Sequence, residues 1–456
     1  MSQPFSGYDN QPFINLSEEE LKEKVKGCIK VTKGDAQLKS SSFDAQFDPY
    51  FELSDYNMPT VDLFENCVGE KTTLQTLFVS EKYQLSNDAL PCVIGITDNK
   101  EVCVADLAKM PNLLIAGASG TGKSTLCHSI IFSLLQKKHP ADLKFVLIDL
   151  KGLEFNCYNR IEKHYLAKMP DINDAVVTNE DDAVRTLESL GVEIDQRVGL
   201  LKSAGCRNVE EYNDTFKNRR LLPTEGHRYL PYIVLVIDDY SLLISSKGKE
   251  AGEKLLKLLG MGKAVGIHTI IGTSRVSTDV FSTQMKSYTP ARIVFRVNSA
   301  SESRSLLDMV GANVLGEFGE MMVLIPGNSV TKVFGASVSS KDIKCITEYV
   351  GNQRGYADAY HLPDVRDVGA FIWEDSDDGG RDSLFEEAAR IVVQTQIGST
   401  SMIQRKLKLG YNRAGHIVDQ LEAAGIVGPF NGSKTREVKV ANEYELERIL
   451  RNLDVY

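Results

Sequence analysis

One stretch, PNLLIAGASGTGKST at residues 111–125, constrains the fold of this chain more than any other part of the sequence. It contains the pattern G-x-x-x-x-G-K-[ST], filled by Gly117, Gly122, Lys123 and Ser124. Apolar residues precede the pattern, as in a buried strand, and the residues after it have the apolar face of a helix. This order places backbone N–H groups at a helix N-terminus, where phosphate binds. The stretch therefore predicts a phosphate-binding loop in an α/β fold.

The loop residues divide the chemistry of phosphate binding among them. Glycine lets the backbone wrap around phosphate groups, Lys123 brings a positive charge to the outer phosphates, and the hydroxyl of Ser124 can coordinate Mg²⁺. We therefore expect a nucleotide and Mg²⁺ to bind here. The candidate nucleotide-binding residues are Gly117, Ala118, Ser119, Gly120, Thr121, Gly122, Lys123, Ser124 and Thr125.

A second apolar segment, YIVLVIDDY, ends in the acids that such a loop needs. A P-loop enzyme requires one acid at the end of a neighbouring strand to hold Mg²⁺, and a carboxylate beside it to orient the attacking water. Asp238 is the candidate for the magnesium side and Asp239 the candidate base. A pair of helix-capping acids after a strand would look the same, and that alternative stays open.

Apolar segments of strand length alternate with helical segments from about residue 92 to residue 350. This alternation predicts an α/β domain with a parallel sheet covered by helices. The expected strands are Leu113–Ala116, Phe145–Asp149, Ile233–Asp238, His268–Thr273, Arg292–Val297 and Met321–Ile325. The expected helices are 124–137, 181–203, 248–264 and 301–309.

Charge and composition restrict the partners and the location of the chain. A formal net charge of −10 excludes coating of nucleic acid through bulk positive charge, so any such contact is local. The longest apolar runs have strand length, which predicts no membrane span, and the N-terminus lacks a signal pattern. We expect a cytoplasmic protein. Its eight cysteines include no C-x-x-C pair and no histidines at metal-ligand spacing, which argues against zinc and for free or buried thiols.

The rest of the chain divides by composition. Residues 1–60 form a polar arm, in which a capping box at Ser17 predicts one short helix. Residues 353–382 end in the acidic run EDSDDGGRD and predict a flexible linker. We therefore expect the nucleotide-binding domain at 61–352 and a small final domain at 383–456.

The final domain has the pattern of a winged helix. The run STSMIQRKLKLGYNRAGHIVDQLEAAGIV predicts a helix, a tight turn through Gly410 and a second helix from about Asn412 to Ala424. The dipeptide Asn431-Gly432, a strong hairpin signal, then lies between short strands and predicts a wing.

Local charge permits DNA binding by this domain. Between residues 401 and 440, seven Lys and Arg face three Asp and Glu, a local balance of +4. Asn412, His416 and Asp419 recur at i, i+4 and i+7 and so share one face of the second helix. A solvated helix face would give the same pattern, and that alternative stays open. The candidate DNA-binding residues are Asn412, Arg413, His416, Asp419, Lys434 and Arg436.

Taken together, these motifs resemble the FtsK/SpoIIIE family of DNA translocases. The matching segments before residue 214 are VADLAKMPNLLIAG, FVLIDLKGLEF and CRNVEEYN. Further segments, LPYIVLVIDDYSLLI, AVGIHTIIGTSR and PARIVFRVNSASESRSLLD, keep the order and spacing of the family. The resemblance covers about residues 90–350, and again from about 382 to the end, where the chain resembles the γ domain of the family.

The resemblance implies a RecA-like P-loop motor that forms a hexameric ring around double-stranded DNA and moves along it by using ATP, in chromosome segregation and cell division. It places Lys123, Asp238, Asp239 and Arg275 in catalysis, with Mg²⁺ on Ser124 and Asp238. It also implies a γ-like domain that recognises short oriented DNA sequences and, in some members, contacts a site-specific recombinase. Family members carry membrane helices and an α subdomain; for this chain we expect no membrane anchor and a reduced subdomain.

The sequence departs from the family pattern at and beside the expected catalytic residues. Asp239 stands where the family has Glu, and Ser274 and Val276 stand where Gln and Pro flank the arginine at Arg275. A 1 Å misplacement of a catalytic group can cost about a hundredfold in rate. An alternative function follows: a DNA-binding accessory protein that binds ATP but hydrolyses it slowly, assisting a full-length membrane-anchored paralogue.

Two further positions have alternatives of their own. Arg304 is a weaker candidate for a charge presented to the nucleotide of a neighbouring subunit, and a surface ion pair is the alternative. His416 stands where the family commonly has Arg. Arginine binds guanine with two hydrogen bonds, which neutral histidine cannot do, so we expect a changed or weakened site preference.

Overall fold

The computed structural model describes residues 47–64, 72–277, 280–316, 319–364, 384–407, 411–428 and 436–453. The helix expected from the capping box at Ser17 lies outside these residues. Within them, no helix combines the length and the apolar character that crossing a membrane requires. The described cysteines are free thiols, in line with the expectation; they are Cys92, Cys103, Cys127, Cys157, Cys206 and Cys345.

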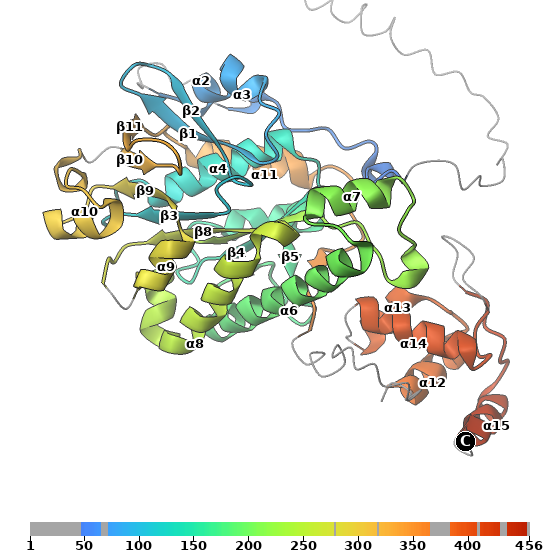
Figure 1. Ribbon diagram of the computed structural model, residues 1–456. Coiled ribbons are helices and arrows are strands. Elements are labelled where there is room, and N and C mark those ends of the chain that lie inside the picture. The colour runs from blue at the N-terminus through green and yellow to red at the C-terminus, as the bar shows by residue number, and fades with distance from the viewer. Residues whose placement is uncertain are drawn as a thin grey trace, which may run out of the picture. The chain divides into compact units, whose positions relative to one another are not determined.

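A ten-stranded sheet lies at the centre of the nucleotide-binding domain, in the order β2-β1-β11-β10-β9-β3-β8-β7-β4-β6 (Figure 1). Strands β9, β3, β8, β7, β4 and β6 run parallel, whereas β2, β1, β11 and β10 pair antiparallel along one side. The strands are β1 (Pro91–Thr97), β2 (Val102–Asp106), β3 (Asn112–Ala116), β4 (Leu143–Ile148), β6 (Val176–Val177), β7 (Tyr232–Ile237), β8 (Ile267–Thr273), β9 (Ala291–Phe295), β10 (Glu320–Leu324) and β11 (Thr331–Phe334). The fold class is α/β, as expected.

Helices cover both faces of this sheet. They are α2 (Leu74–Phe78), α3 (Glu81–Gln84), α4 (Lys123–Lys137), α5 (Glu162–Tyr165), α6 (Glu180–Ala204), α7 (Val209–Lys217), α8 (Tyr240–Met261), α9 (Thr283–Tyr288), α10 (Ala300–Leu307) and α11 (Ser340–Gly351). Residues at both ends of α6 cap this helix. Asn179 accepts hydrogen bonds from the N–H groups of Asp181 and Asp182, and Gly205 ends α6 with a φ of 67°.

One expected helix, at 248–264, begins in the structure at Tyr240 instead. Asp239 caps this earlier start, because its side chain accepts a hydrogen bond from the N–H of Ser241. Gly248 interrupts α8 with φ 51° and ψ −124°, a conformation that is not helical. The interruption divides α8 into two segments, of which only the second has the pattern expected from the sequence.

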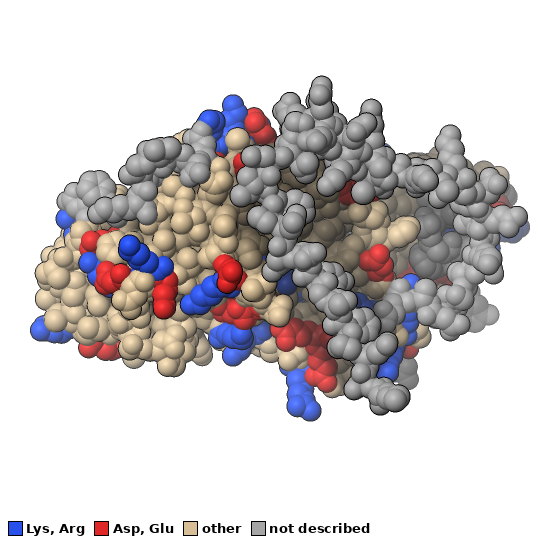
Figure 2. Space-filling view, turned by 90° about the horizontal axis from the view of Figure 1, so that it is seen from above, with Lys and Arg blue, Asp and Glu red and all other residues tan. Residues whose placement is uncertain are grey.

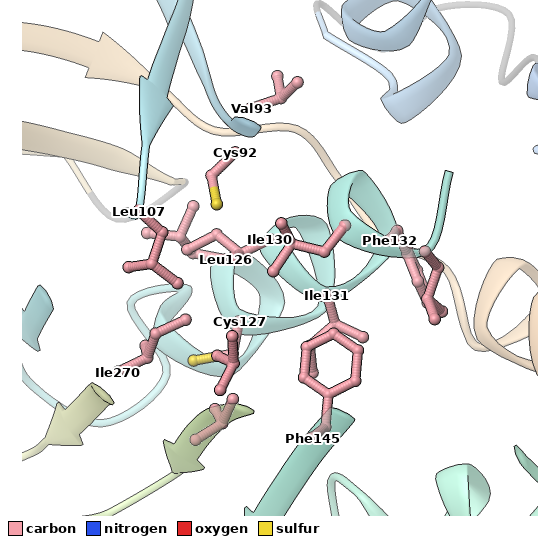
Figure 3. Close-up of a cluster of buried hydrophobic side chains, with 14 of the residues drawn as sticks. Cys92, Val93, Leu107, Leu126, Cys127, Ile130, Ile131, Phe132, Phe145 and Ile270 are labelled. Carbon is pink, nitrogen blue, oxygen red and sulfur yellow. The ribbon is translucent and has the colours of Figure 1, made fainter. Parts of the chain in front are cut away.

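Two apolar clusters, one on each face, hold the helices on the sheet. Helices α4 and α11 pack on one face, and α6 and α8 pack on the other (Figure 1). Neighbouring residues of β3 alternate between the clusters, since Leu113 and Ile115 belong to the first and Leu114 to the second. Figure 3 shows side chains of α4, such as Cys127 and Ile130, packed between the β1 side and the central strands. Contacts with β1 on one side and with the central strands on the other therefore fix α4. They also fix the start of the helix, where the preceding loop ends.

The first part of the expected linker is ordered against the nucleotide-binding domain. Strand β12 (Tyr360–His361) pairs in parallel with β5 (Ala167–Lys168). Leu362 is fully buried, and the hydroxyl of Tyr360 accepts a hydrogen bond from Nη1 of Arg228. The acidic run at 374–382 lies outside the described residues.

The C-terminal part has its own apolar core. Its helices are α12 (Phe385–Thr395), α13 (Thr400–Leu407), α14 (Tyr411–Ala423) and α15 (Glu443–Leu453). Ile403, Ile417, Leu421 and Leu446 are fully buried in one cluster that joins the four helices with residues 426–427 and 438–440. An isolated antiparallel bridge joins Val427 to Val438, on either side of the expected wing, whose tip lies outside the described residues.

Candidate nucleotide site

The loop after β3 has a conformation that favours glycine. Gly120 and Gly122 have φ values of 76° and 112°, in the left-handed range. A Cβ at Gly117 would lie 2.7 Å from Cβ of Phe295, and one at Gly122 would lie 3.2 Å from Cε1 of the same ring. Gly122 also precedes the first residue of α4, so the positive end of that helix dipole lies at the loop.

The ammonium of Lys123 lies inside this loop. Its Nζ donates hydrogen bonds to the carbonyl oxygens of Gly117 at 2.9 Å and Ala118 at 2.8 Å. Burial lowers the pKa of Lys123, while the nearby carboxylates of Asp239 and Asp238 favour its charged form. The loop thus combines a buried cation with backbone groups that bind phosphate.

Ser124 and Asp238 meet beside the loop. The Ser124 hydroxyl donates a hydrogen bond of 2.7 Å to Oδ1 of Asp238, which follows β7 and is 6% exposed. Burial raises the pKa of Asp238, and the hydrogen bond from Ser124 partly opposes that shift. A hydroxyl and a carboxylate oxygen are ligands that Mg²⁺ prefers, so this pair fits a magnesium ion at the phosphate loop.

Asp239, expected as the base, has hydrogen bonds to both of its carboxylate oxygens. Oδ1 accepts from the hydroxyl of Ser241 at 2.6 Å and from the N–H groups of Ser241 and Ser274, each at 3.3 Å. Oδ2 accepts from the hydroxyl of Ser274 at 2.8 Å and from Nζ of Lys151 at 3.1 Å. Burial alone would raise the pKa of Asp239, but these hydrogen bonds outweigh it and hold that pKa below its ordinary value.

The two arginine candidates lie at the surface. Arg275 follows β8, and its Nη1 donates a hydrogen bond of 3.4 Å to the hydroxyl of Ser245 on α8. Arg304 is exposed on α10. The structure therefore brings Lys123, Asp238 and Asp239 together at the carboxyl edge of the parallel strands, and leaves the arginines outside that group.

Sequence reasoning missed Lys151, which reaches the site from the loop after β4. Asp149 is fully buried and shapes this loop: its carboxylate accepts hydrogen bonds from the N–H groups of Lys151, Gly152, Glu154 and Phe155. The segment DLKG carried the signal, because an acid and a lysine follow a buried strand at the same edge as the phosphate loop.

The candidate DNA-binding residues are only partly described. The backbone of α14 carries Asn412, Arg413 and His416, whose side chains lie outside the described residues, as does Lys434. Asp419 and Arg436 are described and pair with each other, because Nη2 of Arg436 donates to Oδ1 of Asp419. The same guanidinium also binds Glu422 of α14.

Two family patterns match the chain. The pattern of the FtsK/SpoIIIE family covers residues 73–278, and that of the Ftsk gamma domain covers residues 379–441. The chain belongs to the FtsK/SpoIIIE family. The first match includes the phosphate loop, both aspartates and Lys151, and the second includes α13, α14 and Arg436.

Relatives of this FtsK/SpoIIIE-family chain match most of its length. A DNA translocase FtsK from Chlorobaculum tepidum is 40% identical over 386 residues, which cover 84% of this chain and 47% of that protein. DNA translocase SpoIIIE from Bacillus subtilis is 35% identical over 353 residues, 77% of this chain and 43% of that protein. The chain spans about half the length of the curated relatives it matches.

A solved structure has a fold similar to that of this chain. The cytoplasmic domain of the Type VII secretion ATPase EccC from Thermomonospora curvata matches 65% of this chain and 35% of its own length. The TM-score is 0.52 at 20% sequence identity, so the similarity concerns the fold alone.

Proposed function

We propose that this chain is an ATPase motor that moves double-stranded DNA. The observation that carries the proposal is the 2.7 Å hydrogen bond between Ser124 and Asp238 beside the buried ammonium of Lys123, an arrangement suited to a triphosphate with its Mg²⁺. The names of the relatives, DNA translocase FtsK and DNA translocase SpoIIIE, indicate the work that the hydrolysis drives.

Each residue of the site has a task in this proposal. The loop backbone and Lys123 bind the phosphates of ATP, while Ser124 and Asp238 hold Mg²⁺, which neutralises phosphate charge when it is bound. Asp239 orients the attacking water. Its low pKa suits this task, because an ionised carboxylate accepts a hydrogen bond from water at neutral pH.

We propose that the C-terminal helices bind DNA and recognise its base sequence. The net positive charge between residues 401 and 440 supports phosphate contacts there. In the described part of the molecule visible in Figure 2, basic and acidic side chains are interspersed rather than gathered into a broad basic area. On this face, strong contact with DNA is therefore assigned to local groups and not to a broad basic area.

Assembly and location extend this proposal. We infer a homohexameric ring on double-stranded DNA, in the cytoplasm, in which a neighbouring copy supplies the cation that the site of one chain needs. The exposure of Arg275 and Arg304 supports this inference, since an exposed arginine is available to a second copy. A site-specific recombinase and a membrane-anchored paralogue are the proposed protein partners.

The test is ATP hydrolysis by the purified protein with and without duplex DNA. We expect duplex DNA to raise kcat, and Lys123→Ala to abolish hydrolysis, because that variant loses the cation of the phosphate loop. Lys163→Met, which removes an exposed lysine of α5, is the matched control and should hydrolyse ATP as the wild type does. Hydrolysis that duplex DNA leaves unchanged would reject the motor and favour the slowly hydrolysing accessory protein.

A further inference from the structure

Lys151 lies in a loop whose backbone is held by hydrogen bonds to one buried carboxylate. Four backbone N–H groups, those of Lys151, Gly152, Glu154 and Phe155, converge on the single carboxylate of Asp149 at 2.7 to 3.2 Å. Because Asp149 is fully buried, the loop has little freedom to move as a unit. The lysine side chain therefore starts from a fixed backbone position at the edge of the sheet.

The two oxygens of Asp239 have different tasks, although Ser274 donates to both of them. Oδ1 accepts from Ser241 and thereby caps α8, which is a structural task. Oδ2 faces Ser274 and Lys151, at 2.8 and 3.1 Å. Lys151 can thus be removed without removing the helix cap, so the two tasks of this carboxylate are separable by mutation.

We propose that Lys151 is a positioning residue for Asp239, and that its ammonium fixes the direction of the Oδ2 oxygen at the nucleotide site. The inference rests on the proposed function, in which Asp239 orients water. It gives the loop after β4 a part in hydrolysis, beside the loops after β3, β7 and β8.

An ordinary surface ion pair would not have this arrangement. Such pairs join two flexible side chains in water and contribute little. Here the side chain of Asp239 is 5% exposed and is held by Ser241 in the first turn of α8 and by Ser274 after β8, whereas the side chain of Lys151 is 41% exposed. The ammonium and the carboxylate therefore restrict each other, and Lys151 is one of the two groups that hold Oδ2.

The shorter side chains at 239 and 274 make the contact from Lys151 more important. Aspartate cannot extend as far as the glutamate of the family pattern, and its Oδ2 is shared between one serine and one lysine. Removing the lysine leaves one hydrogen bond to restrain that oxygen. A small rotation of the carboxylate then moves it away from the direction in which it was held.

Hydrolysis kinetics provide the first test. In Lys151→Met, we expect kcat for DNA-stimulated hydrolysis to fall about ten- to a hundredfold, with KM for ATP changed less than about twofold. Lys151→Arg keeps the charge and should recover most of the loss, and Lys163→Met should match the wild type. A raised KM with an unchanged kcat would overturn the proposal, because it would place Lys151 on the nucleotide rather than on Asp239.

A second test needs neither ATP nor DNA. The thermal midpoints of the wild type, Lys151→Met, Asp239→Asn and the double variant form a cycle. We expect Lys151→Met to lower the midpoint in the wild type and to have almost no effect in the Asp239→Asn background. Equal effects in both backgrounds would overturn the coupling. Absence of hydrolysis in the wild type would reject the proposed function while this cycle still decides the contact.

Discussion

Ser124 and Asp238 stand 114 positions apart in the sequence, and the hydroxyl of the first donates a 2.7 Å hydrogen bond to the carboxylate of the second. The contact exists because β8 alone separates β3 from β7 in the sheet, so the loops after these parallel strands emerge at the same edge. The loop after β4 brings Lys151 to the same edge, and the loop after β8 brings Ser274. The site is thus a product of strand order, and its members come from four loops.

Asp238→Asn should separate metal binding from nucleotide binding. The amide keeps the size of the carboxylate but loses the charge that holds Mg²⁺. We expect the affinity for a fluorescent ATP analogue to fall about tenfold with Mg²⁺, and to stay nearly unchanged in EDTA. Asp195→Asn removes an exposed carboxylate on α6 and is the control. Equal losses with and without Mg²⁺ would contradict the metal role.

Gly248→Ala should destabilise the protein, whereas Gly252→Ala should not. Gly248 has φ 51° and ψ −124°, and Cβ in that conformation is strained even though no atom lies within 4 Å. We expect a loss of about 1–2 kcal/mol in the free energy of unfolding. Gly252 lies in the regular second half of α8, with ordinary contacts at 3.7 Å, and alanine there should add about 0.5–1 kcal/mol. Urea unfolding of both variants measures the difference, and equal effects would show that the interruption is not strained.

Much of the sheet was predictable from the sequence. All six expected strands exist, with ends shifted by at most two residues. Five of them have apolar runs that are buried on both faces, and the sixth, β10, alternates between buried and partly exposed residues. The start of α8 was not predictable in this way, since Gly248 and the polar residues around it break the helical pattern. Strand β12 was missed as well, because two residues paired with β5 leave no periodic signal.

The candidate site was predictable where a motif encodes it. The loop from Gly117 to Ser124 has a fixed spacing, so the sequence alone located it. The contacts of Asp239 with Lys151 and Ser274 join three strand ends, and no local pattern records which loops meet. In the C-terminal part, the sequence indicated the charges of Asp419 and Arg436 but not that these two residues pair.

His268 should make the protein less stable as the pH falls through the weakly acidic range. Burial lowers the pKa of His268 to about 4, against 6.5 for an ordinary histidine. The charged groups that influence it are Asp106 of β2, Lys263 after α8 and Arg197 of α6. The unfolded chain takes up the proton first, so stability is full above about pH 6.5 and falls towards pH 4, by about 3 kcal/mol at most.

His268→Gln removes this titration and gives the matched measurement. Chemical unfolding of wild type and variant from pH 7.5 to pH 4 should show a smaller decline for the variant. Because other groups titrate in both proteins alike, the difference between the two curves is the relevant quantity. Parallel curves would contradict a buried neutral imidazole at this position.

His416→Arg should change the DNA sequence that the chain prefers. Arginine on the exposed face expected for α14 can donate two hydrogen bonds to guanine, at O6 and N7. Neutral histidine has only one N–H donor and cannot do so. Selection of bound sequences from a random duplex pool should show added preference for guanine at one position. An unchanged selection would argue that this helix face is only solvated.

Arg436→Gln tests whether this arginine contacts phosphate or holds the domain together. Its side chain is 10% exposed, its guanidinium binds Asp419 and Glu422, and its N–H donates to the carbonyl of Gly398 at 2.8 Å. We expect a lower thermal midpoint for the C-terminal part, because two acids on α14 lose their common partner. A residue that binds phosphate would instead reduce the slope of log affinity against log salt by about 1. Salt titrations with a short duplex should therefore give the wild-type slope, and a reduced slope with an unchanged midpoint would place Arg436 on the DNA.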